Sequence, residues 1–504
     1  MTLDLPVRKK APSAKFAPGV PKRGRHVRPS APPTRKARHI NAIVEHIGAD
    51  HLIPVYPRPA PAQPRPSEFI RLARRDLLSL WWNEAYDYKI MPTRIFGRQV
   101  TILNNPHAIQ HVMVKNHDNY ERKAPQQRRA LEQLLGDGLF ISDGETWQFR
   151  RREVAATVHR RKLDIFAPVM VDATEELAQH WHQMGDGAQV DALVEMADLT
   201  AEIIARAVFG SKLGRDKTLE VIQGFTDYQK VVNQINVAYF LGADDGWPLF
   251  PGPRRRASIA RVHRVIDELI AHHLSGRGDP NSMIAMLMKS VDPRTDKPMT
   301  PVELRNEAAT IFMAGHETTA ATLTWAWYLL SRAEWAEDQL HRELDEVLGG
   351  RAPTLADVPR LKYTRAIIDE TLRLYPPVPI LGRQAKEADM IGEFPIDAKS
   401  LVLVIPWLLH RHEEFWERPH NFEPDRFLDK RPKFPFAYTP FAVGPRVCAG
   451  TAFGQVEAVL CLATLAQQFR VRVPEGADVV PQCRLTLRPR GGLPVTIHPR
   501  RDRG

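Results

Sequence analysis

Cys448 is the residue of this chain best suited by its surroundings to hold a metal. It is one of only three cysteines in 504 residues, and a helix-like run over residues 451–469 follows it directly. A thiolate is the form of cysteine that binds metals, and the free N–H groups at the start of a helix stabilise such an anion. The alternative is a buried structural cysteine beside a turn, which is the common role of a lone cysteine.

The residues around Cys448 could bind a flat cofactor that carries carboxylates. Gly444 and Gly450 allow the backbone to approach such a group, and Phe441 can shield the sulfur from water. Arg446 supplies a cation for a carboxylate. The segment resembles the haem-binding loop of the cytochrome P450 monooxygenases, Phe-x-x-Gly-x-Arg-x-Cys-x-Gly, at all five fixed positions. This resemblance implies haem b as the cofactor and Cys448 as its iron ligand.

The longest helix-like stretch, Pro301–Arg332, carries an acid beside a hydroxyl. Ala314 and Thr318 are four residues apart and share a helix face, so a flat ligand can lie against them. A glycine and two consecutive threonines favour a local opening of the helix that admits a water. The segment resembles the family's oxygen-activating signature, which implies that Glu317 and Thr318 deliver protons to dioxygen. For His316 we expect a buried ring with satisfied hydrogen bonds.

A second pair, Trp147 and Arg151, is also four residues apart and would present an indole N–H and a guanidinium on one helix face. The pair resembles the family's Trp-x-x-x-Arg contact to a haem propionate, and the resemblance assigns Arg383 to the other propionate. A further hairpin over residues 485–497, turned at two glycines, would place its tip beside the pocket. We expect four apolar side chains to line the substrate pocket: Val378, Ile380, Leu381 and Leu493.

Glu370 and Arg373 are three residues apart on a predicted helix, Lys362–Leu374, among apolar neighbours that indicate partial burial. They resemble the family's Glu-x-x-Arg motif, which implies Arg426 as a third partner. We expect this triad to be structural.

Composition indicates an ordinary globular protein, with 43% apolar and 26% charged residues. Three cysteines without paired spacing indicate a reducing compartment. No apolar run is long enough to span a membrane, and no signal peptide is evident, so we expect a soluble, bacterial-type enzyme in the cytoplasm without a transmembrane anchor.

The net charge of +11 is concentrated near the N-terminus, where residues 1–38 hold eleven Lys or Arg and one Asp. This proline-rich segment cannot bury enough apolar surface to fold alone. We predict a disordered tail over residues 1–40, followed by one P450 domain over residues 41–504. The tail could make nonspecific contact with anionic lipid or nucleic acid, although a nucleic-acid partner is not expected. An organelle transit peptide is a third alternative, which the many prolines disfavour.

The resemblance implies a mainly helical fold with a minor β lobe (α+β), and the least patterned helices, residues 165–290, are expected to control substrate access. Helix-like spacing over residues 67–84 and a strand pair over residues 93–103, turned at Gly97, would begin the fold.

The resemblance also implies a reaction: insertion of one atom of O2 into a small lipophilic substrate by a monomer. Electrons would come from NAD(P)H through a ferredoxin or flavodoxin-type donor and its reductase. We expect the donor to dock on a basic surface that includes some of Arg150, Arg152, Arg160, Arg161 and Lys162. Two alternatives are a peroxide-using peroxygenase and a haem-based sensor or carrier, neither of which requires the acid and hydroxyl of Glu317 and Thr318.

Overall fold

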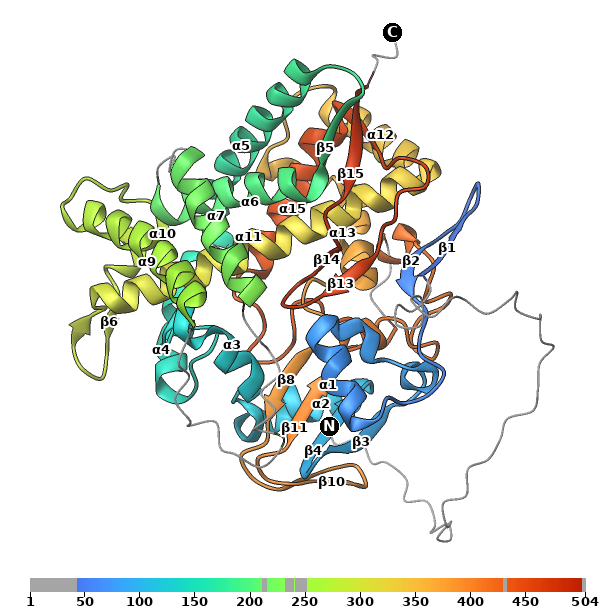
Figure 1. The fold of residues 1–504 in the computed structure, drawn as a ribbon. Helices are drawn as coiled ribbons and strands as arrows, with labels where there is room; N and C mark the ends of the chain where they lie inside the picture. Colours follow the sequence, from blue (N-terminus) through green and yellow to red (C-terminus); the bar gives the residue numbers. More distant parts are fainter. Residues whose placement is uncertain (1–42, 211–214, 232–239, 241–251, 429–432, 501–504) are drawn as a thin grey trace, which may run out of the picture. The chain divides into compact units, whose positions relative to one another are not determined.

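The computed structural model describes residues 43–210, 215–231, 240, 252–428 and 433–500. The basic segment over residues 1–40 lies outside this part of the chain, so its disorder stays a prediction. Within residues 41–504 the architecture is mainly helical with small sheets, as Figure 1 shows, and this confirms the predicted fold class. No helix among the described residues is both long and apolar enough to cross a membrane.

The helices differ widely in length, and the longest, α11, runs through the middle of the domain (Figure 1). In chain order they are α1 (Pro66–Arg75), α2 (Pro106–Gln110), α3 (Pro125–Leu135), α4 (Gly144–Thr157), α5 (Leu163–Met184), α6 (Ala192–Phe209), α7 (Arg215–Val231), α9 (Pro253–Leu274), α10 (Met283–Leu287), α11 (Pro301–Arg332), α12 (Glu334–Leu348), α13 (Lys362–Leu374), α14 (Pro406–Leu409) and α15 (Thr451–Ala466).

The strands are short and form several small sheets. They are β1 (Ile43–Ile47), β2 (Leu52–Pro57), β3 (Ile90–Ile95), β4 (Arg98–Leu103), β5 (Ala188–Asp191), β6 (Val291–Asp292), β7 (Lys297–Pro298), β8 (Leu381–Gln384), β9 (Asp389–Ile391), β10 (Phe394–Ile396), β11 (Leu401–Val404), β12 (Phe469–Arg472), β13 (Pro481–Cys483), β14 (Leu487–Pro489) and β15 (Pro494–Pro499).

The sheet that bears on the site has the order β3-β4-β11-β8. Strands β3 and β4 are antiparallel, β4 and β11 are parallel, and β11 and β8 are antiparallel. In this register Val402 lies opposite Arg383, so a buried strand fixes the position of a predicted cofactor contact. The predicted turn at Gly97 is present, and Phe96 beside it has a positive φ of 53°.

Helix α11 has the bounds predicted from the sequence, Pro301–Arg332. Thr300 accepts a hydrogen bond from the N–H of Glu303, whose side chain bonds back to Thr300, and Pro301 occupies the first turn. The predicted helix over residues 67–84 is instead interrupted after Arg75. There the side chain of Asp76 accepts a hydrogen bond from the N–H of Leu78 and starts a separate short turn.

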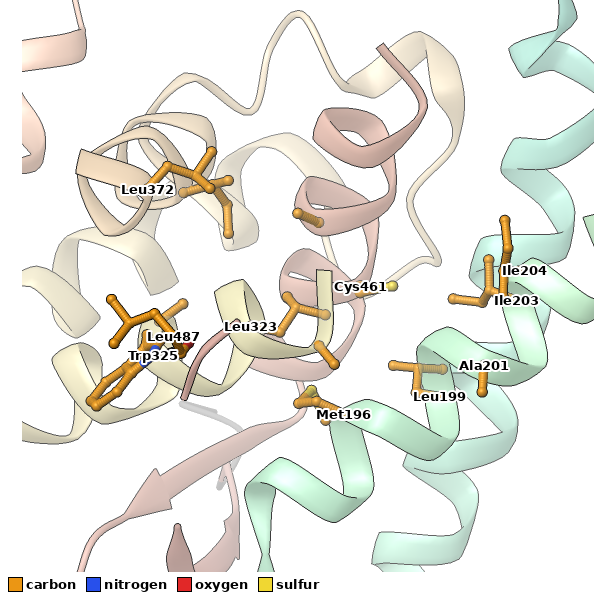
Figure 2. Packing of buried hydrophobic residues seen from close by; sticks show 14 of the residues in the cluster. Met196, Leu199, Ala201, Ile203, Ile204, Leu323, Trp325, Leu372, Cys461 and Leu487 are labelled. Carbon is orange, nitrogen blue, oxygen red and sulfur yellow. Dashed lines mark hydrogen bonds between the residues drawn. The ribbon is translucent and has the colours of Figure 1, made fainter. Parts of the chain in front are cut away.

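The core is formed by α11 together with α5, α6, α13 and α15. Figure 2 shows buried side chains from four of these helices, among them Ile203 on α6, Leu323 on α11, Leu372 on α13 and Cys461 on α15. The indole of Trp325 stacks on the ring of Tyr375 with centroids 4.0 Å apart, and its N–H donates to the carbonyl of Leu487 at 3.2 Å. This packing fixes α11 firmly, so residues at its centre have defined positions.

Candidate functional site

An interior cavity of about 700 Å³ brings together most of the predicted site residues. Its wall is largely apolar and is formed by α3, α4, α11, the start of α15, strand β8 and the loop over residues 440–450. The predicted residues that line it are Trp147, Arg151, Ala314, Glu317, Thr318, Val378, Ile380, Leu381, Arg383, Phe441, Arg446, Cys448 and Gly450.

Cys448 lies at the end of the loop that leads into α15. Its side chain is exposed although it lies inside the domain, because it faces the cavity. The N–H of Cys448 donates to the carbonyl of Phe441 at 2.9 Å, which closes the loop. Burial raises the pKa of the Cys448 thiol, while the N–H of Gly450 and the cations of Arg151 and Lys123 act against this rise. A metal ion would favour the thiolate further.

Gly444 packs against a neighbouring segment and does not line the cavity. Its φ is +77°, and an added Cβ would lie 1.9 Å from the carbonyl oxygen of Met113. The expectation that Gly444 lets the backbone approach a cofactor was therefore wrong, because this glycine lets the loop pack on the segment around Met113.

Helix α11 presents a small side chain and a hydroxyl to the cavity. Ala314 is exposed in the middle of a helix whose neighbours are mostly buried, and it lines the cavity with Glu317 and Thr318. The Thr318 hydroxyl donates to the carbonyl of Ala314 at 2.7 Å. The helix is continuous here, so the expected local opening of its hydrogen bonds is not seen in the structure. The hydroxyl instead satisfies its donor within the helix.

Several cations line one cavity, although buried charges usually require an acidic partner at close range. The guanidinium of Arg446 lies over the ring of Trp147 at 4.2 Å and donates to the carbonyl of Ser142 at 2.8 Å. Its Nε and second terminal nitrogen are buried and have no hydrogen-bond partner among the described residues. Arg383 is 4% exposed and donates to the carbonyl of Gly382. Burial and the charge of Arg446 lower the pKa of Arg383 to about 10.

Lys123 is a cavity residue that the sequence motifs did not identify. Its ammonium lies 3.3 Å from the centre of the Phe140 ring, and its strand bridge to Arg383 places it beside that guanidinium. Burial, followed by the charges of Arg383 and Arg446, lowers the pKa of Lys123 well below its usual value. A cluster of this kind fits a ligand with two negative charges.

Comparison with known proteins shows which family has this arrangement. The model of the family described as Cytochrome P450 matches residues 68–494. The chain belongs to the cytochrome P450 family. This P450 is therefore an oxidoreductase that incorporates oxygen, and its cofactor is a haem held by a thiolate.

Relatives and solved structures agree with the family. The P450 is 34% identical to cyclooctatin synthase of Streptomyces melanosporofaciens, over 79% of this chain and 86% of that protein. It is 30% identical to pentalenene oxygenase of Streptomyces avermitilis, over 73% and 80% of the two chains. The crystal structure of the cytochrome P450DA haem domain matches 88% of this chain and 98% of its own with a TM-score of 0.76. At 24% identity, that similarity shows the fold alone.

The residues present fit a haem. Among the described residues, no three His, Cys, Asp or Glu side chains gather as a metal site, and Cys448 offers a single thiol to the cavity. The unpartnered nitrogens of Arg446 suit a propionate. Ala314, exposed to the cavity, leaves room for a flat ring.

Leu493 is not a pocket residue, which corrects one prediction. It is fully buried in the core, and its N–H donates to the carboxylate of Asp191 at 2.9 Å. The hairpin is formed by β13 and β14, so its turn comes before the two glycines, and Leu485 and Thr486 at that turn line the cavity. Pro494 in β15 pairs instead with Asp191 of β5, because the chain leaves the hairpin after Pro489.

Arg150 is not part of a basic surface. Its side chain is 1% exposed and lies 2.8 Å from the carboxylate of Glu303. Of the other residues predicted there, Arg152, Arg160 and Arg161 are exposed and Lys162 is half-buried.

His316 is buried as expected, but in the part of the chain that the structure describes neither ring nitrogen finds a hydrogen-bond partner. The expectation of a satisfied ring was wrong. Burial and the charge of Arg488 lower the pKa of His316 to about 4, so the ring is neutral near pH 7.

The Glu370 and Arg373 pair is buried, with two contacts of 2.7 Å and no exposed side-chain surface on either partner. Arg373 also donates to the carbonyls of His410 and Asn421 at 2.8 Å each. Arg426 lies 3.4 Å from the Glu370 carboxylate, and the triad lies outside the wall of the cavity.

Of the predicted access region, residues 211–214, 232–239 and 241–251 lie outside the described part of the chain. Ile204 and Phe240 from this region line the cavity.

Proposed function

We propose that this P450 inserts one oxygen atom of O2 into a C–H bond of a lipophilic substrate, with electrons from a separate protein. One observation carries the proposal: a thiol on a loop and an acid beside a hydroxyl on a helix share the wall of one largely apolar cavity. A binding protein would need the thiolate but has no use for a proton donor in that wall.

Haem b, when bound, supplies the iron at which O2 is activated. Cys448 would ligate the iron through Sγ. The propionates would be held by Trp147 and Arg151 from α4, Arg383 from β8 and Arg446 from the loop, and Lys123 would add a further cation to this group.

The proton transfer belongs to α11. Thr318 Oγ1 can hand a proton to the reacting oxygen when it releases the Ala314 carbonyl, to which it donates at 2.7 Å. The Glu317 carboxyl, one residue away in the same wall, can then give a proton to Thr318 Oγ1 and restore its hydroxyl. The apolar side chains around the pair exclude water that would otherwise divert the protons.

The substrate is proposed to be an unsaturated hydrocarbon or its alcohol, of the kind found among terpenoids. Three relatives are named for such compounds: pentalenene oxygenase, cyclooctat-9-en-7-ol 5-monooxygenase and carotene epsilon-monooxygenase. The predicted pocket residues that line the cavity, Val378, Ile380 and Leu381, offer apolar surface to a ligand of this kind.

The electron donor is proposed to be an acidic ferredoxin or flavodoxin that receives electrons from NAD(P)H through its reductase. Arg152 on α4 and Arg160, Arg161 and Lys162 before α5 would form its docking surface, and the buried Arg150 would have no part in it.

The test uses purified holoenzyme with a ferredoxin, its reductase and NADPH under ¹⁸O2. We expect hydrocarbon ligands that shift the Soret band to give a product with one ¹⁸O atom per molecule. Product that carries oxygen only from added peroxide, with none from ¹⁸O2, would contradict the proposal.

A further inference from the structure

The segment between α3 and α4 is fixed to α11 by a buried carboxylate. The N–H of Leu139 donates to both oxygens of Glu307, at 3.0 and 3.2 Å. Glu307 has no exposed surface. A buried carboxylate is costly because burial penalises its charge. Burial accordingly raises the pKa of Glu307 to about 7.

Two glycines let this segment approach α11 closely. An added Cβ on Gly138 would lie 2.3 Å from the hydroxyl oxygen of Thr310 and 2.9 Å from the carbonyl of Asn306. Gly136 has a φ of +55°, and its added Cβ would lie 2.2 Å from the side chain of Asn306. Any larger residue would push the segment away from the helix.

A buried arginine adds α4 to the same contact. Arg150 lies 2.8 Å from Glu303, and 3.5 Å from both Glu307 and Asp137. The residue that follows it, Arg151, lines the cavity. One cluster of charges therefore joins the segment, the cation-bearing helix α4 and the oxygen-activating helix α11.

The segment ends in the wall of the cavity, where Leu139 and Phe140 present apolar side chains. We propose that Glu307 is a positioning residue that holds this wall in place and thereby sets the size of substrate that the cavity accepts. Glu307 touches neither cofactor nor substrate in this role. The inference rests on the proposed function, because a wall has meaning only for a ligand that enters the cavity.

The experiment compares Glu307→Leu with Glu307→Gln in the holoenzyme. Leucine removes the acceptor of the Leu139 N–H, whereas glutamine keeps an oxygen there. Gly138→Ala is a second, independent way to displace the segment without touching the carboxylate. The matched controls are Glu337→Gln, another carboxylate with 1% exposure that pairs with Arg472, and Gly97→Ala, where nothing lies within 4 Å of the added Cβ.

Two azoles that bind haem iron serve as probes, and their dissociation constants are read from the Soret band. Imidazole is small enough to bind without contact to Leu139 and Phe140, whereas clotrimazole is large enough to contact them. For Glu307→Leu and Gly138→Ala we expect about tenfold weaker clotrimazole binding, with imidazole binding within about twofold of wild type. Hydrogen exchange in peptides that cover residues 137–140 should be about tenfold faster in both variants. Glu307→Gln and both controls should match wild type.

Faster exchange in residues 137–140 without a change in the ratio of the two dissociation constants would overturn the proposal. The same change in Glu337→Gln would also overturn it, because general loss of stability would then explain the effect. Failure of wild-type protein to bind imidazole would contradict the proposed function instead, and the exchange rates would still decide whether Glu307 holds the segment. If Glu307→Leu does not fold, Gly138→Ala decides the outcome by the same two measurements.

Discussion

At the scale of single residues, most polar side chains of this P450 that bear on the site have their hydrogen bonds made, and a few do not. The Thr318 hydroxyl already donates within its helix, and the Arg373 guanidinium is fully bonded. In contrast, two nitrogens of Arg446 and both ring nitrogens of His316 are buried and accept or donate no hydrogen bond within the described residues. Unsatisfied buried groups are costly, so those in the cavity wall indicate where a ligand completes the structure. His316 does not line the cavity, and no ligand is inferred for it.

Thr318→Ala should separate electron consumption from product formation. Without the hydroxyl, proton delivery fails and electrons leave as peroxide, so product per NADPH should fall by about tenfold or more. Haem content should not change. Thr322→Ala is the matched control, since Thr322 lines the same cavity and donates to the Thr318 carbonyl at 2.8 Å. Product per NADPH that stays at the wild-type value in Thr318→Ala would refute the role in proton delivery.

Glu457 on α15 should make stability depend on pH. It is fully buried, it accepts a hydrogen bond from the Thr319 hydroxyl at 2.9 Å, and burial raises its pKa to about 8. Because the folded state then binds a proton more tightly than the unfolded state, stability is present at low pH and is lost as pH rises from about 4.5 to about 8.

Glu457→Gln removes this dependence, so the unfolding temperature of the variant relative to wild type should rise steadily between pH 5 and pH 8. The exposed Glu475→Gln is the control and should track wild type. If the unfolding temperature depends on pH equally in wild type and in Glu457→Gln, the Glu457 carboxyl does not titrate in that range.

At the scale of elements, α11 determines the site because its neighbours fix it at several points. Its N-terminal half holds the segment over residues 137–140, its centre presents Ala314 and Thr318, and its C-terminal half packs Trp325 on Tyr375. The bounds of α11 and α13 match those predicted from the sequence. The prolines that follow α13, Pro376 and Pro377, are a local signal for its end.

Other features could not be predicted because they depend on distant partners. The side chain of Asp76, at the end of α1, accepts a hydrogen bond from the nearby N–H of Leu78. It also accepts one from the N–H of Cys483, which is far along the chain. The burial of Arg150 follows from Glu303 on another helix, and nothing near Arg150 in the sequence signals it. Lys123 was missed because its place beside Arg383 arises only from a strand bridge between remote segments.

Glu370→Ala should destabilise the fold without removing the site chemistry. The substitution leaves the charge of Arg373 buried with only carbonyl partners, at a cost of about 3 to 5 kcal/mol. Denaturant unfolding of the holoenzyme measures the loss. Glu370→Gln, which keeps one acceptor, should lose less. A stability equal to wild type in Glu370→Ala would show that the triad is not needed for the fold.

At the scale of the whole molecule, the proposed electron donor would be attracted by the charge of the protein surface. The net charge of +11 lies mostly in residues 1–38, outside the described part of the chain. Within the described part, the proposed docking surface consists of a few exposed cations. Arg160 and Arg161 are exposed near the start of α5, close in sequence to the cation-bearing helix α4. An acidic partner would be attracted there, and salt would screen the attraction.

Reversal of two charges, Arg160→Glu with Arg161→Glu, should slow reduction by a ferredoxin about tenfold at low salt and remove most of its salt dependence. Stopped-flow reduction under carbon monoxide measures the rate. Arg277→Glu is the control at another exposed arginine. A double variant as fast as wild type at every salt concentration would exclude this surface.

The central claim is that the sulfur of Cys448 holds a haem iron, and the spectrum of the reduced carbon monoxide complex tests it most directly. For the purified wild-type holoenzyme we predict a Soret band of the thiolate type, and Cys448→Ala should lose it while the fold of the chain persists. A wild-type spectrum of the histidine type, or a thiolate-type band that survives in Cys448→Ala, would contradict the account.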